Sequence, residues 1–224
     1  MSSSQLLFRE RKALAEPAEG LLILHHGRGT DETDLLPLGD VLDPTRRLHI
    51  VTPRGPLALE GMPGRHWYKV PRVGHPDPET FAAARTALAE LHDELWRTTG
   101  IDPTRTVLGG FSMGSVMSYA LGLDQQRPAP AGILACSGFI PDVPGWEPDL
   151  DARPGLPVFV SHGRRDPVIP VQLGRAAAER LEQGGLTVLY HEFDGSHEIP
   201  ATVLMAARAW LSKTLGLEDG AAER

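Results

Sequence analysis

The stretch VLGGFSMGSV, residues 107–116, runs from an apolar segment through Gly110, Ser112 and Gly114 into a second apolar segment. The pattern G-x-S-x-G is weak evidence alone, because two glycines and a serine recur by chance. Its setting is more informative, since the first segment is typical of a buried strand and the second of a helix. In such a strand–turn–helix the tight turn leaves room only for glycine on both sides of the serine. The stretch therefore predicts that Ser112 is a nucleophile at the end of a buried strand.

Short apolar runs alternate with helical patterns along the rest of the chain. Several runs are apolar almost throughout, as expected of strands buried on both faces. The alternation predicts a mostly parallel central sheet with helices on both faces. An earlier segment, 6–14, predicts an additional antiparallel hairpin at the edge of the sheet. The expected strands are 21–27, 47–53, 105–112, 131–138, 156–163 and 186–193, and the expected helices are 77–100, 113–126, 171–185 and 200–216.

Length and composition are those of a globular protein. The chain has 224 residues, enough for one substantial core, and 41% of them are apolar. We expect a single domain over 1–224, with 1–5 and 217–224 frayed. The formal charge is −7 without a basic cluster, so nucleic-acid binding is not expected. No apolar run approaches the roughly 20 residues of a membrane span, so membrane insertion is not expected either.

The cellular compartment is suggested by two features. The apolar stretch near the N-terminus, Leu6 to Phe8, is too short for the hydrophobic part of a signal peptide, and charged residues follow it at once. Cys136 is the only cysteine, so no internal disulfide is possible. Both features favour the cytoplasm. The sequence leaves open whether the protein is a monomer or a homodimer.

A serine hydroxyl needs a base to become a nucleophile, and position selects one among the nine histidines. His197 follows the last expected strand, and Asp166 follows the strand before it. Both lie at the carboxyl ends of parallel strands, where α/β proteins bind ligands. The chain order Ser112, Asp166, His197 is that of α/β-hydrolases and differs from the two common serine-protease orders. The sequence thus predicts a triad of these three residues.

Two members of this triad have rivals. Asp166 could instead cap a following helix, with Asp142 or Asp194 as the acid. His162 and His191 are rivals for the base, although the first lies at a strand end and the second inside a strand pattern.

A tetrahedral intermediate also needs N–H donors for its oxyanion, and they are expected at two places. One is the backbone N–H of Met113, which directly follows the serine. The other is the loop after the first buried strand, where Gly27 and Gly29 let the backbone approach a ligand and Arg28 supplies the N–H. Asp31 is expected to cap a helix that starts just after it.

Segment 52–78 is rich in proline and glycine and is expected to be irregular. A long loop in a compact domain is often functional. Trp67 and Tyr68 lie within it and are either core residues or part of an acyl pocket. Together with Gly27, they are our candidate substrate contacts.

Two further features have structural interpretations. His25 and His26 cannot chelate one ion together, since neighbouring strand residues point to opposite faces. We therefore expect no metal site, and expect His26 to pack beneath the oxyanion loop. Cys136 lies in an apolar run, as a small buried hydrophobe would.

These elements together resemble the phospholipase/carboxylesterase family of α/β-hydrolases, which includes the acyl-protein thioesterases. The resemblance runs in family order from residue 22 to about 215. It implies an α/β-hydrolase fold without a separate cap domain, the triad Ser112–Asp166–His197, and oxyanion donors at Arg28 and Met113. It also implies hydrolysis of carboxylic esters or thioesters with no cofactor. The matching segments are HGRGTDETDL, RHWYKV, GGFSMGSVMS, CSGFIP, HGRRDPVIP and DGSHEIP.

The chain departs from the acyl-protein thioesterases at two positions. Those enzymes carry glutamine where this chain has Met113, which matters little if the backbone N–H does the work. They tend to carry an apolar residue where Arg28 stands, and its guanidinium could favour an anionic substrate or point to solvent. The expected function is a serine esterase that acts on a small-molecule ester of small to medium acyl length. The alternatives are a thioesterase or lysophospholipase acting on longer chains, and a non-enzymatic binding protein with this fold.

Overall fold

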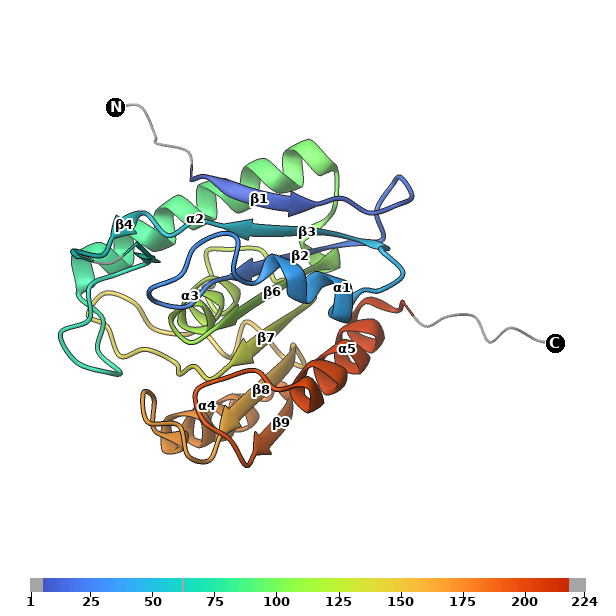
Figure 1. Ribbon diagram of the computed structural model, residues 1–224. Helices are drawn as coiled ribbons and strands as arrows, with labels where there is room; N and C mark the ends of the chain where they lie inside the picture. Colours follow the sequence, from blue (N-terminus) through green and yellow to red (C-terminus); the bar gives the residue numbers. More distant parts are fainter. Residues whose placement is uncertain (1–5, 62, 218–224) are drawn as a thin grey trace.

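The computed structural model describes residues 6–61 and 63–217, and within them a seven-stranded sheet forms the centre of the molecule (Figure 1). Six strands run parallel, as predicted, and the edge strand β1 pairs antiparallel with β3. The segment predicted as an edge hairpin is therefore a single edge strand. In spatial order the strands are β1 (Phe8–Arg11), β3 (Leu48–Pro53), β2 (Gly20–His25), β6 (Thr106–Phe111), β7 (Gly132–Cys136), β8 (Pro157–Gly163) and β9 (Thr187–Phe193).

The inner strands are buried on both faces because helices cover the sheet from both sides. Every residue of β2, β3 and β7 is buried, which explains why apolar residues predominate in these segments. One face is covered by α2 (Pro78–Thr99), α3 (Met113–Gly122) and α4 (Val171–Gln183). The other is covered by α1 (Gly39–Leu42) and α5 (Ala201–Leu215). The predicted α/β architecture is confirmed, and no separate cap is evident among the described residues.

The longest helix begins and ends as its sequence predicts. The Asp77 carboxylate accepts the Thr80 N–H at 3.0 Å and so caps the amino end of α2. Gly100 follows the helix with φ +69°, a left-handed conformation that glycine adopts without strain.

Two helix predictions are corrected. The helix after Ser112 ends at Gly122 instead of 126. The helix expected after Asp31 is replaced by turns, a 3-10 helix η1 (Leu36–Leu38) and the four-residue α1. Pro37 has no N–H to donate to the preceding turn, so a regular helix cannot run through it. Asp31 instead accepts the Thr33 N–H at 2.9 Å within a turn.

Segment 52–78 is irregular, as predicted, apart from a two-stranded ribbon of β4 (Leu57–Ala58) and β5 (Arg65–His66). This ribbon is bound to the loop after β2. The Gly29 N–H donates to the Arg65 carbonyl at 2.9 Å, and the Arg65 N–H donates to the Thr30 carbonyl at 2.8 Å. A side chain at Gly64 would overlap the Gly29 backbone at 2.1 Å. The long segment therefore packs directly on the loop where an oxyanion donor is predicted.

The C-terminal boundary expected for fraying is one residue too early. Leu217 is buried, and its carbonyl accepts the Arg47 guanidinium at 2.6 Å. The other residues expected to fray, 1–5 and 218–224, lie outside the described residues.

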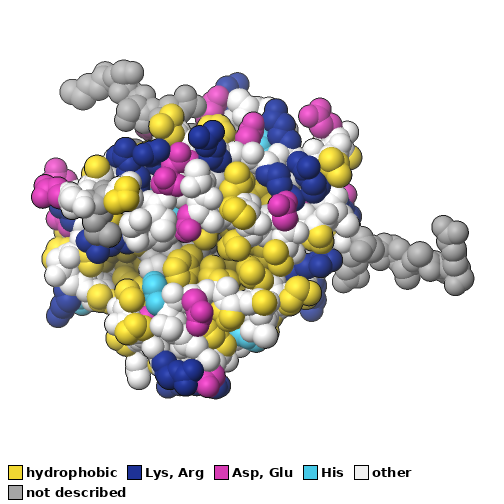
Figure 2. Space-filling view, viewed as in Figure 1, with side chains coloured by type: hydrophobic (Ala, Val, Ile, Leu, Met, Phe, Trp, Pro, Cys, Tyr) yellow, Lys and Arg dark blue, Asp and Glu magenta, His cyan; other side chains and the backbone are white. Residues whose placement is uncertain are grey.

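The surface facing the viewer in Figure 2 carries an apolar band across the region of α1 and α5. These two helices carry exposed Val41 and Met205. Among the described residues, no helix is both long and apolar enough to cross a bilayer.

Candidate active site

Ser112 stands at the turn between β6 and α3, as the sequence predicts. Its backbone has φ 55° and ψ −120°, a conformation that is costly for a residue with a side chain. The turn is closed by its glycines. A Cβ on Gly110 would lie 2.4 Å from the Gly114 carbonyl carbon, and one on Gly114 would lie 1.9 Å from the His25 carbonyl oxygen. The two glycines are therefore required by direct contact, which matches the interpretation as a nucleophile elbow.

His197 and Asp166 meet Ser112 at this turn. His197 Nε2 lies 2.9 Å from Ser112 Oγ, and His197 Nδ1 lies 2.6 Å from Asp166 Oδ2. The Asp166 carboxylate only accepts when ionised, so Nδ1 carries the ring proton and Nε2 is free to accept from the serine hydroxyl. The three residues predicted from separate strand ends thus form one hydrogen-bonded chain.

Main-chain contacts hold the histidine loop against the aspartate loop. The Arg165 N–H donates to the Gly195 carbonyl at 2.9 Å. A side chain at Gly163 would lie 2.1 Å from the Ser196 carbonyl oxygen, so the close approach of the two loops depends on glycine there. The Phe111 ring lies against the His197 ring with centroids 4.7 Å apart.

The Asp166 side chain is fully buried and oriented by the backbone. Its Oδ1 accepts the N–H groups of Val168 and Ile169 at 2.8 and 2.9 Å. This leaves Oδ2 directed at His197. Burial of the carboxylate is compensated by these three donors.

The rival acids and bases have other partners, and His162, whose Nε2 lies 2.9 Å from the Ile169 carbonyl oxygen, does not replace His197 beside Ser112. Asp142 lies 3.3 Å from His75, and Asp194 is paired with Arg165 at 3.0 Å. His191 stacks on Phe159, with ring centroids 6.5 Å apart.

The loop after β2 approaches the serine from the side of its glycines. A Cβ on Gly27 would lie 3.6 Å from Ser112 Cβ, so this residue borders the nucleophile. Met113 is the first residue of α3, and Arg28 directly follows Gly27. Neither N–H has a hydrogen-bond acceptor among the described residues. These are the two groups predicted to bind an oxyanion.

The carbonyl of Gly27 is fixed by side chains, which the sequence did not predict. His26 Nδ1 lies 2.7 Å from the Gly27 oxygen, and His26 Nε2 accepts the Gly55 N–H at 2.9 Å. The Thr30 hydroxyl donates to the same Gly27 oxygen at 3.1 Å. Because the Gly27 C=O and the Arg28 N–H belong to one peptide plane, fixing the first also fixes the direction of the second. Burial lowers the pKa of His26, which keeps its Nε2 free to accept.

Trp67 and Tyr68 were candidate substrate contacts, but the structure buries both side chains. Trp67 is 0% exposed and Tyr68 is 2% exposed, so neither offers surface to a ligand. The Trp67 indole N–H donates to the His26 carbonyl at 2.9 Å, and its backbone N–H donates to Met113 Sδ at 3.3 Å. We therefore correct both to core residues. Met113 thus anchors segment 52–78 through its sulfur.

Cys136 and His25, which the sequence analysis also considered, lie in the core of the protein. Burial raises the pKa of the Cys136 thiol to about 11, so the thiol stays protonated. His25 Nδ1 lies 2.9 Å from Ser118 Oγ, and the rings of His25 and His26 both lie against Trp67. Within 6–61 and 63–217, no group of three or more histidine, cysteine or acidic side chains is arranged to hold a metal.

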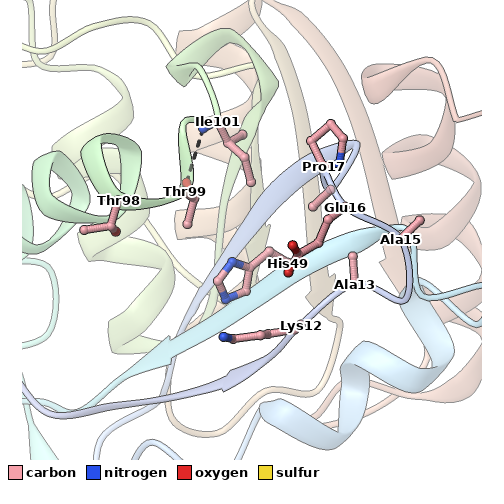
Figure 3. Close-up of a pocket in the computed structure, with 10 residues that line it drawn as sticks. Lys12, Ala13, Ala15, Glu16, Pro17, His49, Thr98, Thr99 and Ile101 are labelled. Carbon is pink, nitrogen blue, oxygen red and sulfur yellow. Dashed lines mark hydrogen bonds between the residues drawn. The ribbon is translucent and has the colours of Figure 1, made fainter.

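A cavity of about 530 Å³ lies away from Ser112, His197 and Asp166 (Figure 3). It is bounded by the segment after β1, by His49 and by the end of α2. His49 stands near the amino end of β3, whereas Ser112 follows the carboxyl end of β6, so the cavity lies toward the opposite edge of the sheet. None of the residues predicted for the site lines it.

The comparisons with known proteins agree with this geometry. The phospholipase/carboxylesterase family matches the chain over residues 12–215. The putative hydrolase MhqD of Bacillus subtilis is 27% identical over 198 residues, which are 88% of this chain and 95% of that protein. Acyl-protein thioesterase 1 of Gibberella zeae is 34% identical over 121 residues, 52% of this chain and 51% of that protein. Among solved structures, esterase PE8 has a TM-score of 0.81 and 28% identity, covering 94% of this chain and 99% of that one.

Proposed function

This chain is an ester hydrolase of the phospholipase/carboxylesterase family, and we propose that it is a serine carboxylesterase that uses Ser112, His197 and Asp166 on esters of small to medium acyl length. The observation that carries the proposal is the hydrogen-bonded chain of these three side chains at a strained elbow. Its small-molecule substrate is an ester, and the chemistry needs no metal or organic cofactor. We expect it to act in the cytoplasm.

In the acylation step, Ser112 Oγ attacks the ester carbonyl carbon while His197 Nε2 takes the hydroxyl proton. Asp166 keeps the ring in the required tautomer and stabilises the positive charge that forms on it. The tetrahedral intermediate collapses as the C–O bond to the alcohol breaks. His197 donates its new proton to the departing oxygen, which leaves an acyl-serine.

In the deacylation step, water attacks the acyl-serine and His197 takes one of its protons. The Ser112 oxygen then leaves, receives that proton and is restored as a hydroxyl. In both steps the carbonyl oxygen becomes an oxyanion, which the N–H groups of Arg28 and Met113 stabilise. Met113 is the first residue of α3, so the positive end of the helix dipole supports the same charge.

Access to the proposed nucleophile is restricted. Ser112 is 7% exposed and the His197 side chain 15%, so solvent reaches only a small part of the reacting groups. The buried positions of Trp67 and Tyr68 leave segment 52–78 without an aromatic wall for a long chain. These features favour a short acyl group. The alternative is action on a long-chain thioester, which the name of the Gibberella zeae relative suggests for that protein.

The proposal predicts that Ser112→Ala abolishes hydrolysis of a p-nitrophenyl ester, because the attacking oxygen is removed. Circular dichroism should show that the variant folds, and wild-type protein should be labelled at Ser112 by a fluorophosphonate. Hydrolysis by the variant at the wild-type rate would refute the proposal. Absence of labelling in folded wild-type protein would favour a binding protein without catalysis.

A panel of esters and thioesters of increasing acyl length separates the two substrate classes. A short-chain esterase should lose kcat/KM steeply beyond about eight carbons, since each methylene without a binding surface forfeits its share of transition-state binding. A rate that keeps rising to long chains would favour the thioesterase or lysophospholipase activity instead.

A further inference from the structure

A second histidine, His162, lies behind the proposed catalytic acid. It stands on β8, is 0% exposed, and has no role in the steps above. His162 Nε2 lies 2.9 Å from the Ile169 carbonyl oxygen and 3.4 Å from Asp166 Oδ2. The Ile169 carbonyl oxygen can only accept a hydrogen bond, and so can Oδ2 of an ionised Asp166. Nε2 therefore carries the ring proton.

The other ring nitrogen is held against glycine. His162 Nδ1 is buried and has no hydrogen-bond partner in the structure. A Cβ on Gly174 would lie 2.4 Å from this atom, so α4 can pack on the ring only because residue 174 is glycine. A second proton on Nδ1 would be buried without an acceptor, which is costly. Burial accordingly lowers the pKa of His162, and the ring stays neutral with one donor, at Nε2.

This donor completes a closed arrangement around the carboxylate. The Ile169 N–H donates to Asp166 Oδ1, and the Ile169 carbonyl accepts from His162. The same Nε2 atom lies 3.4 Å from Oδ2, the oxygen that accepts the hydrogen bond of His197 Nδ1–H at 2.6 Å. His162 thus ties the turn that carries the acid to β8 and contacts the oxygen that holds the base. The charged or titratable groups that act on the ring are Asp166, His197 and Glu192.

We propose that His162 is a positioning residue of the active site, which holds the Asp166 carboxylate in the orientation that His197 requires. The proposal rests on the proposed triad function. Without the Nε2–H donor, the turn at Ile169 loses its tie to β8, and Oδ2 loses the ring nitrogen that lies 3.4 Å from it. The hydrogen bond between Asp166 and His197 then becomes longer and less directional, and His197 is less well placed to take the serine proton.

The test compares three substitutions of His162 that differ in whether, and where, the new side chain carries an N–H donor. In His162→Gln the side-chain amide reaches the position of Nε2 and can donate to Ile169. In His162→Asn the same amide reaches only the position of Nδ1, and His162→Leu has no donor. The variants are compared with wild type by kcat and KM for a p-nitrophenyl ester, with active sites counted by fluorophosphonate labelling at completion.

The proposal predicts that kcat per active site falls about 10- to 100-fold in the Asn and Leu variants, with KM little changed, and that Gln restores most of it. The acid limb of kcat/KM against pH should be displaced in Asn and Leu and lie at the wild-type position in Gln. The proposal would be overturned if kcat fell to the same extent in the Asn, Leu and Gln variants, or if the acid limb were unchanged in every variant.

A measurement that needs no substrate keeps the proposal separate from the esterase assignment. The short Asp166–His197 hydrogen bond should give a strongly downfield imidazole N–H proton resonance in wild type and Gln, and a shifted or broadened one in Asn. If wild type hydrolyses no ester, the esterase proposal fails while this resonance still tests the positioning. An identical resonance in wild type and Asn would refute the positioning role whatever the activity.

Discussion

The buried histidines of the core make stability depend on pH in a way that can be calculated. His25 and His92 are 0% and 1% exposed, and their Nε2 atoms lie 3.4 Å apart. The Ser118 hydroxyl donates to the Gly114 carbonyl at 3.0 Å, so it accepts from His25 Nδ1–H at 2.9 Å. His25 Nε2 is then unprotonated and accepts from His92 Nε2–H. The chain of donors requires both rings to be neutral.

Burial lowers the pKa of His25 to about 3 and that of His92 well below its ordinary value. In the unfolded chain both rings titrate near 6.5. Below that pH the unfolded state therefore binds protons on these rings, whereas the native state keeps them neutral. Stability therefore falls as pH drops through 6.5 and is fully present above it. Each ring costs about 1.4 kcal/mol per pH unit, or about 2 kcal/mol between pH 7 and pH 5. For a domain stable by roughly 5–15 kcal/mol, the pair removes a large fraction.

The variant His92→Gln tests this value, because glutamine can donate to His25 Nε2 but does not titrate. We expect the loss of unfolding free energy between pH 7 and pH 5 to be smaller than in wild type by about 2 kcal/mol, measured by urea denaturation at several pH values. Ser118→Ala is the control, since it removes a hydrogen bond from the same chain without removing a titrating group. It should lower stability by a similar amount at every pH. Equal pH slopes in wild type and His92→Gln would refute the reasoning.

Two predictions concern the oxyanion loop. His26→Leu frees the Gly27 carbonyl from its ring donor, so kcat for a p-nitrophenyl ester should fall about 10- to 100-fold with KM nearly constant; an unchanged kcat in folded variant would show that Thr30 alone holds the peptide. Arg28→Leu keeps the backbone N–H but removes an exposed guanidinium, so kcat/KM should fall for an ester with an anionic acyl group and not for its neutral analogue, with the difference reduced in high salt. Equal effects on both esters would place the guanidinium in solvent, away from the substrate.

The positions of the three central site residues could be predicted because they depend on strand ends alone. Parallel strands bring their carboxyl ends to one edge, so Ser112, Asp166 and His197 needed only correct strand assignments. The elbow glycines follow from the same logic, since the serine turn has little space. The buried strands could also be predicted, because helices on both faces make most of their residues apolar.

The surroundings of the oxyanion loop could not be predicted in the same way. The path of 52–78 is set by contacts such as Gly64 against Gly29, which leave no periodic signal in the sequence. The sequence therefore leaves Trp67 open between the core and an acyl pocket, whereas in the structure its indole N–H donates to the His26 carbonyl. The helix expected after Asp31 failed for a local reason that was present in the sequence, because Pro37 interrupts it.

Two neutral histidines support opposite halves of the site, and their burial explains why they can do so. His26 uses its Nδ1–H on the Gly27 carbonyl, and His162 uses its Nε2–H on the Ile169 carbonyl. A proton added to His26 Nε2 would face the Gly55 N–H, and one added to His162 Nδ1 would have no acceptor. Burial lowers the pKa of both rings, so protonation of either support requires more acid than an exposed histidine does. The frame around Ser112 consequently keeps one protonation pattern while His197 gains and loses a proton in the proposed cycle.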